Sequence, residues 1–318
     1  EALAPVLAEF EAANNARVEI FQPGDSLQIL NRAILEKGNP SADVLFGVDN
    51  ATVVRGLAAG IFLPYQSREL ANVPAQFQFD PSDSVTPVDY GYIALNYHQE
   101  GLAQRGLPPP QSLSDLAQPE YRGTLVVEDP RTSTPGLGFM LATIATFGEE
   151  GPYTWRHYWR DLRQNDLVVT ESWSPAYFSE FSLYGGDRPV VVSYNTSPPY
   201  EGLTRDPLAP SPTQALLVDL ASFAQIESVG ILAGTQQLAL AQRFVDFMLS
   251  KEFQTVFSAA NVVCPVSILA TPAPFCATAS VPQVAANAVL DTARIAANLD
   301  RWLDQWFSVV IKGEEPSN

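Results

Sequence analysis

The feature that most constrains this chain is a short apolar strand, followed at once by a polar turn and an apolar helix. Residues 124–127 (TLVV) predict a buried strand, and residues 139–148 (FMLATIATFG) predict a buried helix that stops at a glycine. Between them, Ser133 or Thr134 suits the N-cap and Pro135 the first helical position. Anions and hydroxyl groups bind at such helix starts in open α/β sheets, because backbone N–H groups and the positive end of the helix dipole lie there. Capping alone is explained by an ordinary helix start. Whether this helix start also binds a ligand has to be judged from the rest of the sequence.

The same alternation of strands and helices recurs along the chain. Strands are expected at residues 17–21, 43–48, 85–97, 167–170, 189–194 and 225–232, and helices at residues 2–13, 27–35, 51–59, 153–162, 238–249 and 293–309. A turn at Pro23-Gly24-Asp25-Ser26 precedes the second helix. The β–α–β–α order predicts a largely parallel sheet covered on both faces.

A length of 318 residues suits two α/β lobes better than one core. The long aromatic strand at 85–97 is expected to make the first crossing between lobes, and the strand at 225–232 to make the crossing back. Lobe 1 is therefore expected to comprise residues 1–88 and about 228–262, and lobe 2 residues 89–227 and about 263–318.

The charge of the chain argues against a nucleic-acid-binding protein, and its hydropathy argues against a membrane-spanning one. The chain has 35 acidic residues against 18 lysines and arginines, a formal net charge of −17, which argues against nucleic-acid binding because that affinity depends on Lys and Arg. The same charge modestly favours cationic partners and equally serves solubility. No run of about 20 apolar residues, as a membrane-spanning helix needs, occurs in the sequence.

Two cysteines, Cys264 and Cys276, flank a proline-rich loop. In an extracytoplasmic protein they would pair and close a short loop, a contribution of about 3 kcal/mol in the chain-entropy model. The alternative is two unrelated buried thiols, and no second cysteine pair or histidine cluster suggests zinc. The chain opens directly with an amphipathic helix, so we expect that sequence preceding Glu1 is missing.

Residues with catalytic chemistry are few. His98 and His157 lie beside no nucleophile signature, and each is better interpreted as solvated or packed. The GxSxG, HExxH and GxxxxGK[ST] motifs are missing from the sequence. Glycoside hydrolysis needs two carboxylates at a defined separation, and a sequence does not show that separation.

Aromatic and small hydroxyl residues instead recur where the expected strands end. They are Asp25, Ser26, Thr132, Ser133, Thr134, Trp173, Tyr177, Tyr194, Asn195, Thr196, Ser197 and Tyr200. In two facing lobes they would line one cleft suited to a flat, cationic, partly aromatic small molecule, with stacking and cation–π contacts of about 0.5–2 kcal/mol each. Taken singly, core packing explains Trp173, Tyr194 and Tyr200 better, and a helix cap explains Asp25.

Several passages resemble the periplasmic thiamine-binding proteins of ABC importers, within the type II periplasmic-binding fold. They are Asp25-Ser26 with Leu30-Asn31-Arg32, Ala42-Asp43-Val44 with Gly47 and Asp49-Asn50, residues 89–92 (DYGY), residues 129–138 (DPRTSTPGLG), Trp173-Ser174 with Tyr177, and residues 193–200 (SYNTSPPY). The resemblance runs from about Val18 to Pro265, and residues 129–138 and 194–200 are its most specific parts.

This resemblance implies two lobes, each a mostly parallel sheet flanked by helices, joined by crossing strands, with the first strand of the fold missing from this chain. It implies an extracytoplasmic protein, periplasmic or lipid-anchored at the cell surface. Such a protein captures thiamine, thiamine monophosphate or thiamine diphosphate in an interlobe cleft and serves the membrane permease of an ABC importer. We therefore expect a monomer that catalyses nothing, uses no cofactor or metal, and binds no nucleic acid.

The family's ligand contacts carry over to Asp25, Ser26, Ser133, Thr134, Trp173, Tyr194, Asn195, Thr196, Ser197, Pro198 and Tyr200. The resemblance implies that Asp25 faces the thiazolium or the aminopyrimidine and that the aromatic residues wall the rings. Ser133 and Thr134 would take the hydroxyethyl group or its phosphate.

This chain departs from the family pattern at three places. It lacks the first strand, which ends in Tyr-Asp-Ser-Phe in the family. It has Val262-Val263-Cys264-Pro265 in place of Trp-Met-Tyr-Pro, and Asn195 in place of Thr.

Two alternatives stay open. The same fold would bind ferric iron or another small cation through Tyr194 and Tyr200, although no histidine lies near them in the sequence. An enzyme acting on a thiamine-like substrate would need a nucleophile or base, and the cysteines and histidines lie outside the matched motifs.

Overall fold

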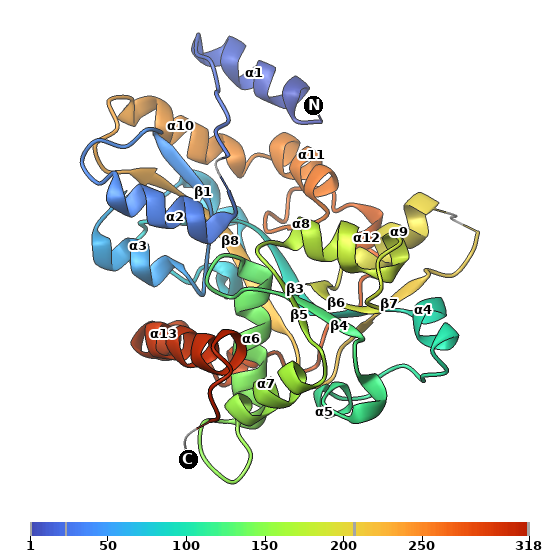
Figure 1. The fold of residues 1–318 in the computed structure, drawn as a ribbon. Helices are drawn as coiled ribbons and strands as arrows, with labels where there is room; N and C mark the ends of the chain where they lie inside the picture. Colours follow the sequence, from blue (N-terminus) through green and yellow to red (C-terminus); the bar gives the residue numbers. More distant parts are fainter. Residues whose placement is uncertain (1, 23, 206–207, 317–318) are drawn as a thin grey trace. The chain divides into compact units, whose positions relative to one another are not determined.

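The computed structural model describes residues 2–22, 24–205 and 208–316, which form two compact units. Unit 1 comprises residues 1–91 and 225–278, and unit 2 comprises residues 92–224 and 279–318. The chain passes from one unit to the other within β3 (Thr86–His98), within β8 (Phe223–Leu232) and after α12 (Pro274–Thr278) (Figure 1).

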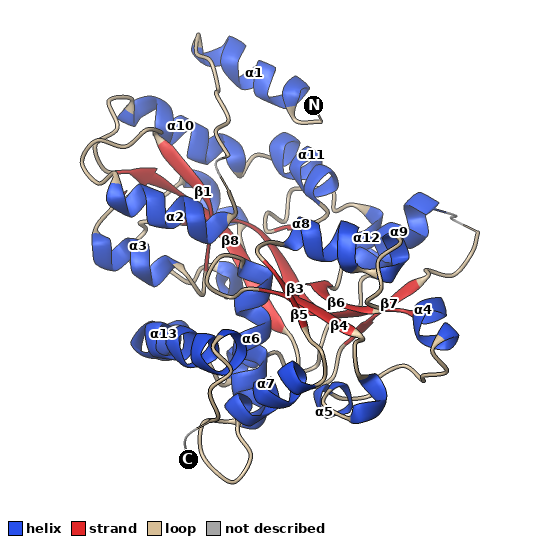
Figure 2. Ribbon diagram, in the orientation of Figure 1, coloured by secondary structure: helices blue, strands red, loops and turns tan. Residues whose placement is uncertain are grey.

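Unit 1 is an antiparallel sheet with helices on both faces (Figure 2). Its strands are β1 (Val44–Asp49), β2 (Phe62–Leu63), β9 (Cys264–Pro265) and the adjoining parts of β3 and β8, in the order β1–β8–β3, with β2 on β8 and β9 on β3. Its helices are α1 (Ala4–Asn14), α2 (Ser26–Leu35), α3 (Val53–Ala59), α10 (Leu238–Met248), α11 (Lys251–Asn261) and α12. One core joins α1, α10 and α11 to the sheet through residues such as Val6 and Phe253, and a second joins α2 and α3 through Leu30 and Val53.

Two predictions are wrong in unit 1. Its sheet is not mostly parallel, because the neighbours of β1 and β3 are β8 and β9, which return after the chain has passed through unit 2 and run in the opposite direction. Residues 17–21 do not form a strand: no described strand hydrogen-bonds to them, and Ile20 and Phe21 are 69% and 56% exposed. Alternating hydrophobicity forms a strand only where a neighbouring strand completes the hydrogen bonds. Pro23 of the predicted turn lies outside the described residues.

Unit 2 contains the parallel strands that the alternation predicts. β4 (Leu125–Glu128) pairs in parallel with β5 (Val168–Thr170) and β6 (Val190–Tyr194), while β3 runs antiparallel to β6 and to β7 (Thr213–Leu216). The helices are α4 (Gln99–Gln104), α5 (Leu113–Leu116), α6 (Thr134–Phe147), α7 (Trp155–Gln164), α8 (Trp173–Pro175), α9 (Ser197–Arg205) and α13 (Thr292–Trp306). The core includes Phe139, Trp159 and Trp306, whose rings meet edge to face at centroid distances of 5.5 Å.

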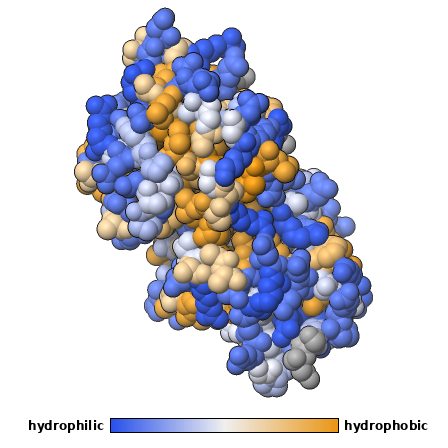
Figure 3. Space-filling model, turned by 90° about the vertical axis from the view of Figure 1, so that its left-hand side faces the viewer, coloured by the Kyte–Doolittle hydropathy of each residue, from blue (hydrophilic) through white to orange (hydrophobic). Residues whose placement is uncertain are grey.

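Cys264 and Cys276 form a disulfide that ties β9 to α12 within unit 1. Among the described residues, none of the helices combines the length and the apolar character that crossing a membrane requires. The face drawn in Figure 3 shows hydrophobic residues interspersed with hydrophilic ones.

Candidate functional site

In unit 2, the start of α6 is held closely against the strands β4 and β3 by two glycines. A Cβ atom on Gly136 would lie 2.3 Å from the carbonyl oxygen of Glu128, and one on Gly138 would lie 2.4 Å from Cδ1 of Ile93. Any larger residue would therefore push the helix off the sheet. The Pro-Gly-Leu-Gly sequence thus fixes where the helix begins, and the residues just before it are positioned by backbone packing.

Ser133 and Thr134 present two unpaired hydroxyl groups at this helix start. Ser133 is the N-cap of the 14-residue helix and is 0% exposed, and Thr134 is 4% exposed. Neither Ser133 Oγ nor Thr134 Oγ1 has a hydrogen-bond partner in the structure. A buried hydroxyl without a partner costs about 1–3 kcal/mol, so such groups usually serve a ligand or a water. Together with the helix dipole, they suit a ligand hydroxyl or an anion.

The one positively charged side chain in the preceding turn, Arg131, already has partners. The Arg131 guanidinium forms an ion pair with Asp129, with Nε 2.9 Å from Oδ1, and lies 4.1 Å from the centroid of the Phe307 ring. Thr132 Oγ1 donates to the carbonyl of Glu171 and so fixes the turn to the segment after β5. The hydroxyls and the helix end are therefore the groups this turn offers to an anion.

Trp173, also in unit 2, is partly buried at the start of α8 and held by two kinds of contact. Its indole Nε1–H donates to Ser193 Oγ at 3.0 Å, and its ring stacks on Tyr177 with centroids 4.6 Å apart and planes inclined by 22°. Ser193 Oγ also lies 3.0 Å from Ser197 Oγ, which links the indole to α9. Because these contacts already fix the indole, a ligand ring that packs against it would cost little further side-chain conformational entropy.

The segment from the end of β6 into α9 combines exposed rings with buried anchors. Tyr194 is partly exposed and Tyr200 is exposed, whereas Thr196, Ser197 and Pro198 are buried. Asn195 accepts from the backbone N–H of Tyr92 at 3.0 Å and donates to the carbonyl of Ser280 at 2.9 Å. Its side chain therefore anchors the turn, while ligand contacts of this segment remain predictions.

Asp25 and Ser26 begin α2 in unit 1. Asp25 is the N-cap: its backbone N–H donates to Gln28 Oε1 at 3.2 Å, and its carbonyl accepts from Ile29. Both residues are partly exposed. Ser26 lies beside Gly47, where β1 has a bulge and φ is +99°; a Cβ atom at that glycine would lie 3.1 Å from Ser26 Oγ. Asp25 thus has the capping role expected of it, and a ligand role for it stays a prediction.

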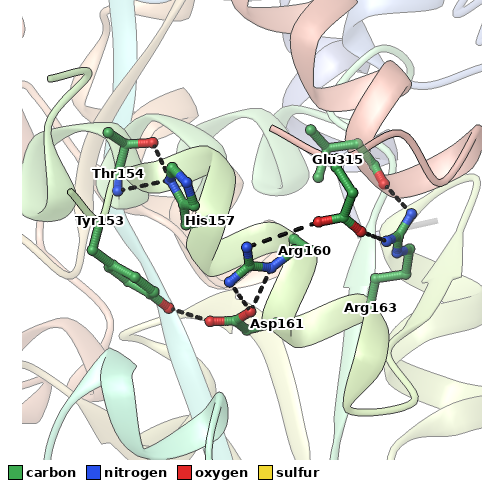
Figure 4. Close-up of polar contacts among 8 residues, drawn as sticks. Tyr153, Thr154, His157, Arg160, Asp161, Arg163 and Glu315 are labelled. Carbon is green, nitrogen blue, oxygen red and sulfur yellow. Dashed lines mark hydrogen bonds and ion pairs between the residues drawn. The ribbon is translucent and has the colours of Figure 1, made fainter. Parts of the chain in front are cut away.

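Both histidines have structural contacts in unit 2, as expected. His157 Nδ1 accepts from the backbone N–H of Thr154 at 3.2 Å and lies 2.9 Å from its hydroxyl, which caps α7 (Figure 4). Burial lowers the pKa of His157, so the ring is neutral near pH 7. His98 Nδ1 lies 2.8 Å from Ser182 Oγ. Figure 4 also shows Arg160 and Arg163 paired with Glu315, and Asp161 bonded to Tyr153 and Arg160.

Three acidic residues of unit 1 were assigned no role from the sequence: Asp49 and Asp89 belong to matched passages, and Glu227 was not singled out. Asp49 and Asp89 are fully buried, and Glu227 is partly exposed. Burial raises the pKa of Asp49 to about 6, and burial raises that of Asp89, which is hydrogen-bonded to Glu227, to about 7. Burial, followed by the charge of Asp89, raises the pKa of Glu227 well above its usual range. A single acid inside an apolar strand sequence, as at Val88-Asp89 and Ile226-Glu227, is the signal that identifies such residues.

Comparison with known proteins places the chain in a family. Residues 39–198 match the model of the bacterial extracellular solute-binding protein family. The thiamine-binding periplasmic protein of Escherichia coli K12 is 32% identical over 301 residues, covering 93% of this chain and 85% of that protein. A solved periplasmic thiamin binding protein is similar with a TM-score of 0.81 and 28% identity, covering 98% of this chain and 94% of that one. Iron-bound HitA from Pseudomonas aeruginosa has a TM-score of 0.75 at 18% identity over 96% and 95% of the two chains, which shows likeness of fold alone. The match over half of the sequence and the 32% identity show that this chain belongs to the bacterial extracellular solute-binding protein family.

Proposed function

We propose that the chain is the extracytoplasmic substrate-binding protein of an ABC importer and captures thiamine or one of its phosphates. The observation that carries this proposal is the start of α6, where two buried hydroxyls without partners meet a helix N-terminus inside the Asp-Pro-Arg-Thr-Ser-Thr-Pro-Gly-Leu-Gly stretch. The similarity to thiamine-binding periplasmic proteins suggests the identity of the ligand.

Each group of candidate residues matches one part of thiamine. Asp25 would offset the positive charge of the thiazolium or accept from the aminopyrimidine, and Trp173, Tyr194 and Tyr200 would flank the rings. Ser133 and Thr134 would take the hydroxyethyl group or the phosphate. Ser26 and residues 195–198 complete the proposed set. The protein would act as a monomer without cofactor or catalysis, and would deliver its ligand to a membrane permease.

Ferric iron has less support as the ligand. Tyrosine phenolates bind ferric iron best alongside other anionic or imidazole ligands. Within the described residues, no group of three or more His, Cys, Asp or Glu side chains is arranged to hold a metal ion.

Calorimetry with thiamine, thiamine monophosphate, thiamine diphosphate and ferric citrate tests the proposal. We expect at least one thiamine form to bind one site with a Kd below about 10 μM, which is about −7 kcal/mol, and ferric citrate to give no comparable heat. Failure of all three thiamine forms to bind more tightly than this would overturn the ligand assignment. Mass spectrometry of thiamine after long incubation tests the absence of catalysis, since release of free thiazole would reveal an enzyme.

A further inference from the structure

Three carboxyl groups of unit 1, on the strands β1, β3 and β8, lie close together. Asp49 ends β1 and is the cross-strand partner of Glu227 on β8. Asp89 on β3 shares a hydrogen bond with Glu227. Within the described part of the chain, no lysine or arginine forms an ion pair with Asp49, Asp89 or Glu227. Carboxylates directly opposite one another destabilise a sheet, so this arrangement needs a reason other than stability.

One oxygen of each of the two inner carboxyls, Asp49 and Asp89, lacks a hydrogen-bond donor. Asp49 Oδ1 accepts three hydrogen bonds, from the backbone N–H groups of Ala51 and Thr52 and from Thr52 Oγ1, whereas Asp49 Oδ2 has no partner. Asp89 Oδ2 has no hydrogen-bond partner either. Both residues are at most 1% exposed, and oxygens this deeply buried are normally paired. The cluster is therefore short of positive charge and of donors.

Glu227 is the member of the cluster that reaches the surface, and it does so beside a candidate ligand residue. Its Oε1 would lie 4.0 Å from a Cβ atom placed on Gly47, and Ser26 Oγ would lie 3.1 Å from the same point. Gln225 Nε2 donates to Glu227 Oε1 at 3.3 Å and so helps to orient the carboxylate. The carboxylate of Glu227 and the hydroxyl of Ser26 therefore flank one glycine at the β1 bulge.

We infer that the Glu227 carboxylate, held by Asp89, is a further ligand-binding group of unit 1 and that it selects for a cationic nitrogen heterocycle. The inference rests on the proposed function and adds a residue that the matched motifs do not contain. Two carboxyls in contact hold one proton between them, because two full charges repel each other in a buried setting. A cationic ring beside Glu227 supplies the missing positive charge and takes the place of that proton. Asp89 positions Glu227 and does not touch the ligand.

Two isosteric substitutions separate a binding role from a structural one. In Glu227→Gln the amide still hydrogen-bonds to Asp89 but carries no charge toward the ligand. In Asp89→Asn the amide donates to Glu227, and the charge of Asp89, which helps to raise the pKa of Glu227, is removed. Glu19→Gln removes one charge at an exposed position of the same unit, where the side chain is 76% exposed, and is the matched control.

The experiment is calorimetric titration of the intact chain and these three variants with thiamine and with its neutral 3-deaza analogue, alongside thermal unfolding. We expect Glu227→Gln to bind thiamine at least tenfold more weakly, with a smaller loss for the neutral analogue. We expect Asp89→Asn to bind thiamine two- to fivefold more tightly, and Glu19→Gln to match the wild type.

Three outcomes would overturn the inference. The first is wild-type affinity for thiamine in Glu227→Gln. The second is an equal loss of affinity in Glu227→Gln and Asp89→Asn together with lowered unfolding midpoints, which would make the pair structural. The third is an equal loss for thiamine and its neutral analogue, which would remove the selection for charge. A wild-type chain that does not bind thiamine contradicts the proposed function, and the inference with it. Thiamine binding that is insensitive to Glu227 contradicts the inference alone.

Discussion

The candidate residues of the two units differ in chemical character. The candidate residues of unit 1 are carboxyl groups. Asp25 caps a helix, and Glu227 is close to the buried carboxyls of Asp49 and Asp89. Unit 2 offers hydroxyls at a helix start and aromatic rings, without a carboxylate among its predicted contacts. Acids attract cations and N–H donors, whereas a helix N-terminus with free hydroxyls attracts anions and hydroxyl groups. Under the proposed function, the acids of unit 1 would contact the cationic ring end of the ligand, and the helix start of unit 2 its hydroxyl or phosphate end.

The largest expected effect comes from the aromatic wall of unit 2. Trp173→Ala should weaken thiamine binding about 100-fold, or about 2.7 kcal/mol, because it removes a ring held in place by Ser193 and Tyr177. Because the indole is only partly buried, the free energy of unfolding should fall by no more than about 1–2 kcal/mol. Titration and urea unfolding measure both effects. A large loss of stability with unchanged affinity would show that Trp173 is a core residue and not a ligand contact.

The proposed phosphate-binding role of unit 2 is tested by removing the hydroxyls of Ser133 and Thr134. The double substitution Ser133→Ala and Thr134→Val should weaken binding of thiamine monophosphate about tenfold more than binding of thiamine, as compared by calorimetry. Stability should stay level or rise, because neither hydroxyl makes a capping or other hydrogen bond. A loss near 1 kcal/mol would instead identify Ser133 as an ordinary N-cap.

The acidic cluster of unit 1 should show itself in the dependence of stability on pH. Asp89 has a pKa of about 7 in the folded chain against an ordinary value of 3.8, so between about pH 4 and 7 the folded state binds more protons than the unfolded state. Stability therefore falls as pH rises through this range, and Asp89→Asn should reduce the fall between pH 5 and 7 by about 2 kcal/mol. Urea unfolding at several pH values measures this slope, and an unchanged slope in the variant would show that Asp89 titrates normally.

The smallest expected effect separates the two roles of Asp25. Asp25→Asn keeps a good N-cap residue and removes the charge. We expect thiamine affinity to fall three- to fivefold while the unfolding midpoint stays within about 2 °C. If the midpoint drops and the affinity does not, Asp25 is a cap alone.

Local patterns were predictable from the sequence and distant pairings were not. The strand, turn and helix at residues 124–148 and the cap of α2 were identified correctly, because capping, glycine packing and hydrophobic period are encoded within a few residues. The antiparallel sheet of unit 1 depends on β8, some 180 residues from β1 along the chain, and no local signal fixes that partner. Asp49 and Glu227 face each other only because of that pairing, which is why the acidic cluster could not be predicted.

The most direct test of this account is the crystal structure of the chain with thiamine monophosphate. We predict that the phosphate hydrogen-bonds to Ser133 and Thr134 at the start of α6, and that the ring end lies against Asp25 and Glu227. A phosphate placed elsewhere, or rings that contact neither acid, would contradict the division of roles between the two units.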